Sequence, residues 1–522
     1  MMKFSFVQAA CAVLASVPYV WAERSDVEID PSTRYQEIEQ FAAADAWSGN
    51  FVGQYFAEPQ KEQIAKWLFS QRIGTDGNPE GIGLSMWRVN LGGGTLEQEG
   101  ANIQPVQRRA ESFLTRDGRA YDWNKCAGQR YFMEKARAYG CDMFLLFSNT
   151  PLVQWTRNGQ GYGEKNDPAA NLRPECYGKF ADYLAEVAKH FQGQGYRIAY
   201  VSPINEPQVN WDSNRQEGSR WRVPEIYNMY VELERALTER KLDSVKMLFG
   251  EAAALKYIYS GEGADEKPDD LARKFFDPAS PWCVRKLKHM PLLIGGHSYH
   301  SEKNPKVFKE TREQLAQTCR QYGLDYQQTE WCFLDCYSAK THSGFTADWK
   351  DNACADIQVG LMLGRLVYSD LVYADAKAWG YWKGMEVDGR FALTSLSPKN
   401  GDLTQGGTVK ANKLLWALGN FSFFVRPKYS RIALSGADNL DGSVGVAFLS
   451  PDRKRLVAVF VNSGFQADDI KIRLPEQDAA RVAQVRAFRT DAQSDLGHAA
   501  VTDREAFTLG PRSLTTVVFD FR

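Results

Sequence analysis

Short apolar runs alternate with amphipathic stretches over most of the chain. Between the runs, apolar residues recur at three- and four-residue spacing, which predicts helices at 174–191, 224–240, 305–322, 352–369 and 409–420. The runs themselves predict buried strands at 39–44, 84–90, 142–148, 198–204, 245–250, 292–298, 326–330 and 376–382. Strand and helix in alternation predict an α/β fold, and eight units over roughly 380 residues predict a (β/α)8 TIM barrel.

After residue 420 the pattern changes to short β-type runs separated by turn residues. These runs lie at 432–434, 444–448, 456–461, 470–474, 482–488 and 514–519. With no helical pattern between them, they predict an attached antiparallel β-sandwich. The extended stretch 27–38 has no position in the barrel and is expected to join that sandwich. We therefore expect a barrel over 41–420 and a side domain made of 23–40 plus 421–522.

The first 22 residues have the pattern of an export signal. Lys3 precedes an apolar stretch from Phe4 to Val20, and Val20-Trp21-Ala22 is typical of a cleavage site. Residues 1–22 are thus expected to be a cleaved signal peptide and the protein to be secreted or periplasmic. A membrane anchor is the alternative, but no second apolar run of spanning length follows, so we expect no membrane span.

Composition and charge exclude several classes of protein. Hydrophobic residues make up 44% and charged residues 24%, which is ordinary for a folded chain and atypical of a disordered one. Lys and Arg number 63 against 64 Asp and Glu, so no basic footprint for nucleic acid is present. Cys332 and Cys336 lack a second ligand pair, so no metal is expected, and no disulfide pairing is predicted. We expect a monomer.

Two acids mark the candidate chemistry. Glu206 follows the fourth strand in Asn-Glu-Pro, and Glu330 ends the seventh. A lone acid there is more often a structural ion pair, but in such barrels reacting groups gather at the carboxyl ends of strands, and strands four and seven face each other. Glycoside hydrolysis needs one carboxylic acid to protonate the leaving oxygen and one carboxylate to attack the sugar or activate water.

The facing positions predict a retaining pair, separated by about 5–5.5 Å. In that interpretation Glu206 stays protonated at rest because the negative charge of Glu330 raises its proton affinity. Once Glu330 is esterified by the sugar, Glu206 loses that reason to hold a proton and acts as a base toward water. No cofactor is required, since both catalytic groups are side chains.

Several motifs, in order along the chain, resemble glycoside hydrolase family 30. They are 35–41 (YQEIEQF) leading to 45–47 (DAW), 205–207 (NEP), 330–331 (EW) and 413–421 (KLLWALGNF). The resemblance covers essentially the whole chain after residue 22 and implies a retaining (β/α)8 enzyme of clan A with an attached β-sandwich. It also implies Glu206 as acid/base and Glu330 as nucleophile. Within the family, 158–161, 171–174 and 216–221 are similar to the endo-β-1,6-galactanase-like branch.

Polar residues near the two acids are candidate substrate or nucleophile contacts. The amide of Asn205 can bind the sugar 2-hydroxyl, a contact that strengthens in the transition state. Arg88, ending the second strand, could orient Glu330, with a structural ion pair as the alternative. The clan resemblance implies that Tyr299 donates its hydroxyl to Glu330. His297 is expected to form hydrogen bonds and not to bind a metal, because no third ligand is visible.

Aromatic residues at strand ends are candidates for stacking on sugar faces, with core packing as the alternative for each. Trp382 is the preferred platform for the innermost sugar, and Trp47 and Trp155 are further candidates. Asn149 and Asp45 complete the expected polar contacts with substrate.

The predicted function is a secreted retaining endo-glycoside hydrolase that cleaves β-1,6-galactan, such as arabinogalactan side chains. The substrate is therefore expected to be a polysaccharide or oligosaccharide. One alternative is another β-glycosidic specificity in the same family, β-glucosyl, β-xylosyl or β-1,6-glucan. A second is a non-catalytic carbohydrate-binding surface protein.

Overall fold

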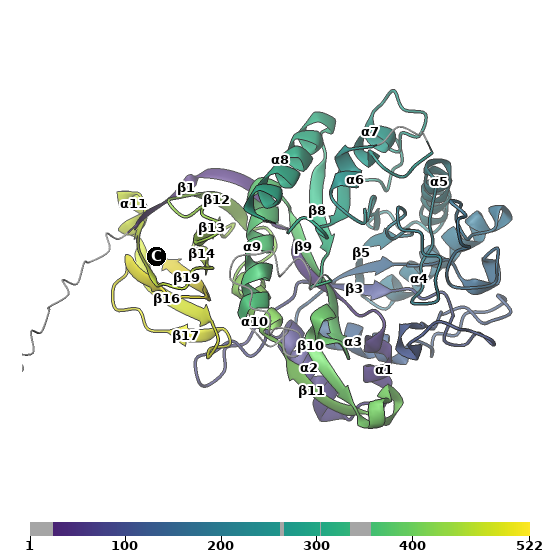
Figure 1. Cartoon of the computed structure of the whole chain (residues 1–522), viewed down its shortest axis with the longest axis horizontal. Helices are drawn as coiled ribbons and strands as arrows, with labels where there is room; N and C mark the ends of the chain where they lie inside the picture. The colour runs from purple at the N-terminus through teal and green to yellow at the C-terminus, as the bar shows by residue number, and fades with distance from the viewer. Residues whose placement is uncertain (1–24, 262–265, 303, 335–356) are drawn as a thin grey trace, which may run out of the picture.

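The computed structural model describes residues 25–261, 266–302, 304–334 and 357–522 (Figure 1). The expected signal peptide at 1–22, Cys336 and the first residues of the helix expected from 352 lie outside the described residues. Within the described ranges, no helix has both the length and the apolar character needed to cross a bilayer. In the same ranges the cysteines are free thiols, at positions 126, 141, 176, 283, 319 and 332.

Eight parallel strands form the barrel, as predicted. They are β2 (Gln40–Ala44), β3 (Met86–Asn90), β4 (Met143–Phe147), β5 (Arg197–Ser202), β6 (Lys246–Met247), β7 (Leu293–His297), β8 (Asp325–Glu330) and β9 (Ala378–Glu386). The ladders run β9-β2-β3-β4-β5-β6 and β7-β8-β9. Backbone bonds close the remaining gap between β6 and β7, where the N–H of Gly295 donates to Phe249 O at 2.7 Å and that of His297 to Ala252 O at 2.9 Å. The (β/α)8 prediction is confirmed.

Helices connect successive barrel strands on the outside, except the last, α10, which follows the barrel. Their bounds are α1 (Ser48–Tyr55), α2 (Glu58–Phe69), α3 (Ala127–Ala138), α4 (Tyr177–Gly193), α5 (Val223–Glu239), α6 (Lys256–Tyr259), α7 (Leu271–Phe276), α8 (Pro305–Tyr322), α9 (Ile357–Tyr373) and α10 (Lys413–Ser422). Local signals fix their ends: the Asn304 side chain caps α8 by accepting from Val307 N–H, and Gly323 ends it at φ 61°. Short 3-10 turns include η2 (Val153–Trp155) and η3 (Pro174–Cys176).

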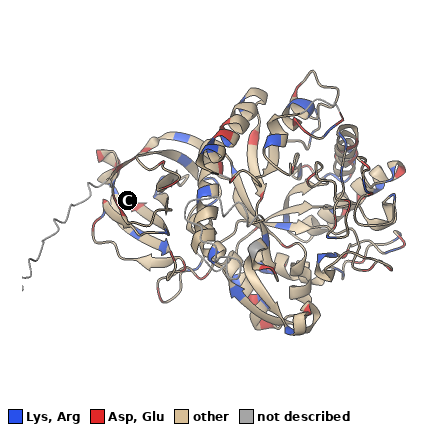
Figure 2. Ribbon diagram, in the orientation of Figure 1, with Lys and Arg blue, Asp and Glu red and all other residues tan. Residues whose placement is uncertain are grey.

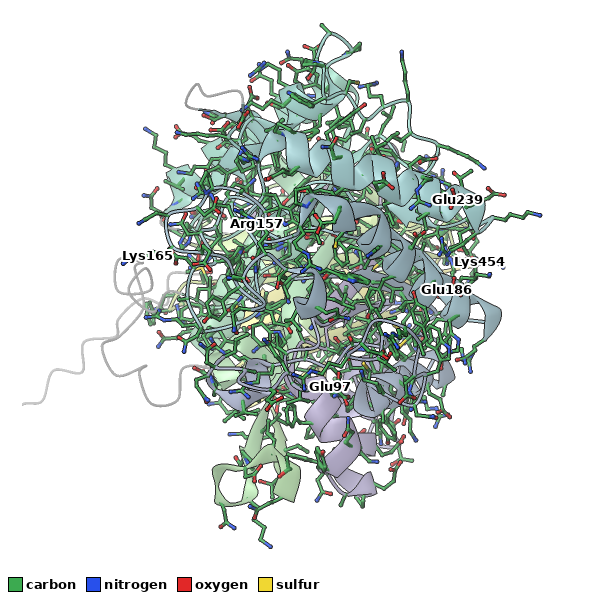
Figure 3. All side chains as sticks on the ribbon, turned by 90° about the vertical axis from the view of Figure 1, so that its right-hand side faces the viewer. Glu97, Arg157, Lys165, Glu186, Glu239 and Lys454 are labelled. Atoms are coloured by element: carbon green, nitrogen blue, oxygen red, sulfur yellow. The ribbon has the colours of Figure 1, made fainter. Side chains whose placement is uncertain are left out.

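The outer faces of the barrel helices carry paired charges. Figure 3 looks toward α4 and α5 and shows Glu186 and Glu239 among them. Arg240 pairs with Glu186 at 2.9 Å, and Arg235 pairs with Glu239 at 2.6 Å. Basic and acidic residues are interspersed along the ribbon (Figure 2), in line with the near-zero net charge.

One feature of the barrel was not predicted from sequence. After β9 the chain forms β10 (Ala392–Pro398), which runs parallel to the end of β9 and pairs antiparallel with β11 (Gly407–Ala411). This hairpin extends the sheet beyond the barrel beside α1 and α2 (Figure 1).

A second, mostly antiparallel sheet forms the attached β domain. Its order is β17-β16-β19-β14-β13-β12-β1-β15-β18. The strands are β1 (Ser25–Glu37), β12 (Ser430–Ser435), β13 (Ser443–Leu449), β14 (Arg455–Asn462), β15 (Asp468–Arg473), β16 (Val482–Thr490), β17 (Gly497–Ala499), β18 (Ala506–Leu509) and β19 (Ser513–Phe521), with α11 (Glu476–Ala479) between β15 and β16. The stretch before the barrel belongs to this sheet, because β1 pairs with both β12 and β15.

The β domain has two buried faces. The sheet curls so that β18 lies against β14 and β19, enclosing a small core that includes Leu456 and Phe460. Alternate residues of the same strands, such as Val457 and Val459, belong instead to the main core. They pack on α9 and α10, which lie between the sheet and the barrel (Figure 1). Successive residues of each strand point to opposite faces of the sheet. One face therefore fills the small core, and the other packs toward the barrel.

Candidate active site

Among the described residues, five ionisable side chains meet at the carboxyl end of the barrel, and all are buried. They are Glu206, Glu251, Glu330, Arg88 and His297, with exposed fractions of 8%, 0%, 4%, 3% and 0%. Each comes from a different barrel strand or the segment just after it. Because isolated charges are costly to bury, such a cluster persists only when its members pair with one another.

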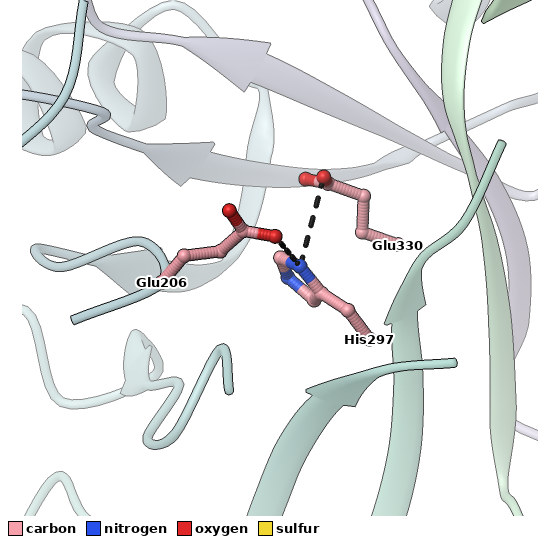
Figure 4. Close-up of side chains that lie close together, drawn as sticks. All are labelled: Glu206, His297 and Glu330. Atoms are coloured by element: carbon pink, nitrogen blue, oxygen red, sulfur yellow. Dashed lines mark hydrogen bonds and ion pairs between the residues drawn. The ribbon is translucent and has the colours of Figure 1, made fainter. Parts of the chain in front are cut away.

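Glu206 lies in the loop after β5, with a left-handed backbone at φ 44°. Its N–H donates to Glu251 O at 2.9 Å, which anchors the turn. Its side chain points toward His297, whose Nδ1 lies 2.7 Å from Oε1 (Figure 4). A left-handed backbone in a residue other than glycine is uncommon and is held here by these contacts.

Glu330 ends β8 and is held through both carboxylate oxygens. Arg88 donates from Nη1 to Oε2 at 2.5 Å, and the hydroxyl of Tyr299 donates to Oε1 at 3.0 Å. The Arg88 guanidinium packs on the Phe147 ring, 3.7 Å from its centroid. Arg88 also donates from Nη2 to Asn205 Oδ1 at 3.1 Å, so the structure brings Asn205 and Tyr299 into the cluster as well.

The two acids expected to react lie close together. One oxygen of Glu206, one oxygen of Glu330 and a ring nitrogen of His297 all lie within 4.8 Å of one another (Figure 4). At most 4.8 Å therefore separates these two carboxylate oxygens, which fits the roughly 5–5.5 Å between the carboxyl groups of retaining pairs better than the roughly 6.5–9.5 Å of inverting enzymes.

Burial raises the pKa of Glu206, and the charge of Glu330 raises it further, while His297 and Arg88 act in the opposite direction. The sequence interpretation named the charge of Glu330 as the cause. Burial is the larger cause, because the carboxyl lies in a low-dielectric barrel end where the charged form is poorly solvated. The direction agrees with a proton donor at position 206.

Glu251 is the site residue that sequence reasoning missed. Its Oε2 accepts from Thr329 Oγ1 at 2.6 Å and lies 3.0 Å from His297 Nε2, and its Oε1 accepts from Arg88 at 3.2 Å. Burial alone would raise its pKa, but the charges of Arg88 and His297 and their bonds lower it to about 2. The signal was available: an acid directly after the fifth predicted strand occupies the same kind of position as Glu206 and Glu330.

A metal ion would fit this cluster poorly at neutral pH, although Glu206, His297 and Glu330 have ligand atoms at suitable spacing. Burial alone would lower the pKa of His297, but the charge of Glu330 and the bonds to Glu206 and Glu251 raise it to about 10. An imidazolium has no lone pair to offer a metal.

Comparison with known proteins gives the family. The sequence profile described as O-glycosyl hydrolase family 30 matches residues 24–389. The chain belongs to glycoside hydrolase family 30. The members of this family are described as O-glycosyl hydrolases.

Three relatives illustrate the match. An endo-β-1,6-galactanase of Hypocrea rufa is 28% identical over 235 residues, which cover 41% of this chain and 47% of that enzyme. The chain thus matches about half the length of this curated relative. A conserved exported protein from Bacteroides fragilis is 29% identical with a TM-score of 0.86, covering 94% of this chain and 100% of the other. The catalytic domain of a family 30 xylanase from Talaromyces cellulolyticus shares the fold at 20% identity, with a TM-score of 0.65 and coverage of 95% and 99%.

In this family 30 hydrolase, two of the predicted tryptophans lie beside the cluster. Trp382 and Trp47 pack edge to face, with ring centroids 5.5 Å apart. The Arg88 guanidinium lies 5.6 Å from the Trp382 ring, so this ring adjoins the ion network that holds Glu330. Trp382 and Trp47 are 8% and 4% exposed, so both rings are largely buried.

The remaining predicted contacts are engaged with protein groups. Asp45 accepts from Asn90 N–H at 2.8 Å and from Gln129 at 2.9 Å, and burial raises its pKa to about 7. Asn149 donates to Asn90 Oδ1 at 3.2 Å, and its own Oδ1 has no partner among the described residues. Trp155 lies in η2 and packs edge-on against Tyr183. Substrate binding by these three residues stays a prediction.

A cleft of about 740 Å³ opens on the Glu206 side of the site. Segments after β5, β6 and β7 line it, and Tyr257 and Tyr259 of α6 contribute aromatic rings. Asn210 and His300 add polar groups. The cleft joins the catalytic cluster through Glu206 and Tyr299, which both line it.

Proposed function

We propose that the protein is a retaining endo-glycoside hydrolase that cleaves β-1,6-galactan, such as the side chains of arabinogalactan, by double displacement. The observation that carries this proposal is the placement of Glu206 and Glu330 within 4.8 Å in unlike surroundings. The pKa of Glu206 is raised, mainly by burial, whereas Glu330 accepts hydrogen bonds from a guanidinium and a phenol.

In the first step, Glu330 attacks the anomeric carbon from one face of the sugar. Glu206 gives its proton to the departing glycosidic oxygen, so the bond from carbon to the leaving group breaks as the ester to Glu330 forms. Arg88 and Tyr299 hold both oxygens of Glu330 in place for attack. Pre-positioning of this kind lowers the entropic part of the barrier.

In the second step, water replaces the leaving group beside Glu206. The acid is now a carboxylate, and esterification has removed the negative charge of Glu330. Glu206 takes a proton from the water, whose oxygen attacks the anomeric carbon and releases Glu330. Two inversions give net retention of the anomeric configuration.

Asn205 is proposed to bind the sugar 2-hydroxyl. Its Oδ1 already accepts from Arg88, which orients the amide so that its NH₂ group is the donor toward substrate. Trp382, next to Arg88 and Trp47, is proposed as the wall of the innermost sugar subsite. The amide contact strengthens as charge develops on the sugar ring.

Two observations support the substrate. The chain resembles the endo-β-1,6-galactanase-like branch at 158–161, 171–174 and 216–221, and the Hypocrea rufa relative carries that activity by name. The cleft beside Glu206 has the volume of an ordinary ligand pocket, about 300–1,000 Å³, and we propose that it holds the leaving-group end of the chain during internal attack. A proton donor at the edge of such a cleft would face an oligosaccharide leaving group.

The nearest alternative is another β-glycosidic specificity on the same machinery, since a family 30 xylanase shares the fold. Product analysis by mass separates the candidates. The protein is incubated with de-arabinosylated arabinogalactan, glucuronoxylan and β-1,6-glucan in parallel. Release of β-1,6-galacto-oligosaccharides alone supports the proposal, and release from xylan or glucan alone refutes it.

A Glu330→Gln variant tests the enzymatic role of the pair against carbohydrate binding without turnover. Binding to galactan that persists while hydrolysis disappears supports Glu330 as the nucleophile. A wild-type protein that binds β-glycans and cleaves none of them would point to the binding role.

We also propose that the protein is exported, secreted or periplasmic, after cleavage behind Ala22. The basis is the sequence pattern of residues 1–22. Amino-terminal sequencing of the mature protein should start at Glu23. A start at Met1 in the extracellular or periplasmic fraction would refute the cleavage.

A further inference from the structure

Glu251 is a fully buried acid that neither chemical step uses. It follows Gly250, which has φ 108° and where a Cβ atom would lie 2.4 Å from Gly295 O, so only glycine fits the turn. Glu251 itself has φ 40°. This turn after β6 aims the Glu251 carboxylate into the end of the barrel, between β3 and β7.

Both oxygens of Glu251 are bonded to neighbouring side chains. Oε1 accepts from Arg88 Nη2 at 3.2 Å. Oε2 accepts from Thr329 Oγ1 at 2.6 Å and lies 3.0 Å from His297 Nε2. No side chain with these three partners has room to turn toward a substrate, so Glu251 acts through the groups that it holds.

Each cation held by Glu251 reaches one member of the catalytic pair. Arg88 donates to Glu330 at 2.5 Å, and His297 Nδ1 lies 2.7 Å from Glu206 Oε1. The backbone adds a third link, because Glu206 N–H donates to Glu251 O at 2.9 Å. One buried carboxylate is therefore connected to both acids.

We propose that Glu251 is a positioning residue that fixes Arg88 against Glu330 and keeps His297 doubly protonated, so that the transferable proton of Glu206 sits on Oε2. The proposal rests on the roles assigned to Glu206 and Glu330 under the proposed function. A doubly protonated His297 donates from both nitrogens, toward Glu251 and toward Oε1 of Glu206. Oε1 is then an acceptor, and Oε2 is the oxygen left to carry the proton to the leaving group.

Charge balance supports the assignment. Glu251 and Glu330 carry two negative charges, and Arg88 and His297 carry two positive ones, so the cluster is neutral when Glu206 is protonated. Without the charge of Glu251 the cluster would hold one excess positive charge, which favours loss of a proton from His297 or Glu206. The Nδ1 atom of a neutral His297 could accept a hydrogen bond from a protonated Oε1 of Glu206. The proton of Glu206 would then lie on Oε1 and point away from the leaving group.

The groups that face His297 come from several elements. They are Glu206 after β5, Glu251 after β6, Glu330 of β8 at 3.6 Å and Tyr299 on its own segment, with Arg88 of β3 beyond the acids. Although burial alone would lower it, the pKa of His297 is raised to about 10 by this surround of acids.

The test is a Glu251→Gln variant read by histidine NMR and by kinetics. In protein labelled at histidine, the His297 signals are assigned with a His297→Gln variant and followed against pH. We expect wild-type His297 to stay protonated through pH 8, and the variant to titrate lower by about one unit or more. With an aryl β-galactoside, kcat should fall about 100-fold while KM changes little, because positioning and not binding is lost.

Two further variants separate charge from structure. Glu251→Asp keeps the charge, so the titration of His297 should stay close to wild type while kcat falls. Asp370→Asn removes an equally buried carboxylate that binds Arg312 and Ser298 and contacts neither Arg88 nor His297. It should lower the Tm and leave the His297 titration unchanged.

The proposal is overturned if Glu251→Gln titrates at His297 like the wild type, or if its kcat stays within about threefold of the wild-type value. The NMR titration needs only folded protein. If the wild type cleaves no β-glycan and the variant still shifts His297, the proposed function fails and the role of Glu251 in holding the charge stands.

Discussion

The hydroxyl of Tyr299 donates to Oε1 of Glu330 across 3.0 Å, and both residues are buried. Burial raises the pKa of Tyr299 well above its ordinary range, so this phenol remains a donor at every pH at which the protein works. Arg88 binds the other oxygen, and together the two donors fix the plane of the carboxylate.

Replacing Tyr299 by Phe removes that one donor and keeps the ring. A hydrogen bond to a charged group contributes about 1.5–3 kcal/mol, so we expect kcat/KM to fall about 10- to 100-fold. Steady-state kinetics with an aryl β-galactoside would measure it. Wild-type kinetics in the variant would show that Glu330 is held without Tyr299.

The pH dependence of activity should report the protonation states of Glu206 and Glu330. Glu206 must be protonated and Glu330 ionised, which gives a bell-shaped profile of kcat/KM. Because the pKa of Glu206 is raised, the basic limb should lie above the range of an ordinary carboxylic acid. In Glu206→Gln, that limb should disappear.

The Glu206→Gln variant should lose more activity on substrates with a poor leaving group than on substrates with a good one. With galactan we expect a loss of about 100- to 10,000-fold, the usual contribution of a general acid, and with a dinitrophenyl galactoside a smaller loss in the first step. Added azide should restore turnover by replacing water. Glu217→Gln is the matched control, since this buried acid bonds to Gly93 and Thr95 and should keep the basic limb.

Glu217 should also make the stability of the protein depend on pH. Burial raises its pKa to about 7, and its Oε2 has no partner among the described residues. A raised pKa means that the folded state favours the protonated acid. The contribution of Glu217 to the free energy of unfolding is complete below the unfolded pKa near 4.5. It is lost as the pH rises through 7, and the loss amounts to at most about 3 kcal/mol.

Glu217→Gln mimics the protonated acid and should remove this loss. The Tm of the variant should match the wild type at pH 5 and exceed it at pH 8, as measured by thermal unfolding at both values. A Tm difference that does not change with pH would contradict the raised pKa.

The cleft beside Glu206 predicts a dependence on chain length. Tyr257→Ala removes a ring that lines it, so kcat/KM on long β-1,6-galactan should fall about 10-fold, while an aryl galactoside should be hydrolysed nearly as before. Tyr55→Ala, which removes an exposed ring on α1, is the control. Equal losses on both substrates would place the leaving group elsewhere.

The sequence predicted the parts of the fold that local patterns encode. Eight buried runs mark the barrel strands, and Glu206 and Glu330 follow from where two of those runs end. The β10–β11 hairpin was missed although Asp388-Gly389 and Asn400-Gly401 are typical turn pairs, because the residues at 409–420 were interpreted as one helix. Residues 407–411 form β11 instead, and α10 begins at Lys413. Glu251 was missed although it directly follows the fifth predicted strand, because its link to both catalytic acids runs through Arg88 and His297, which lie far away in the chain.

The main cause of the raised pKa of Glu206 also could not be predicted from the sequence. Charge on a neighbouring acid can be inferred from residue types, but the depth of burial at Glu206 depends on how the loops after several strands pack over it. That packing is a long-range property. The direction of the pKa shift could therefore be predicted, and its main cause could not.

A covalent double displacement between Glu206 and Glu330 leaves the anomeric configuration unchanged. Proton NMR of the first product formed from a β-1,6-galacto-oligosaccharide, recorded before mutarotation, measures that configuration. We expect the new reducing end to appear as the β anomer and to turn into the α anomer only later. An α anomer as the first product would mean a single inversion and would rule out the covalent route.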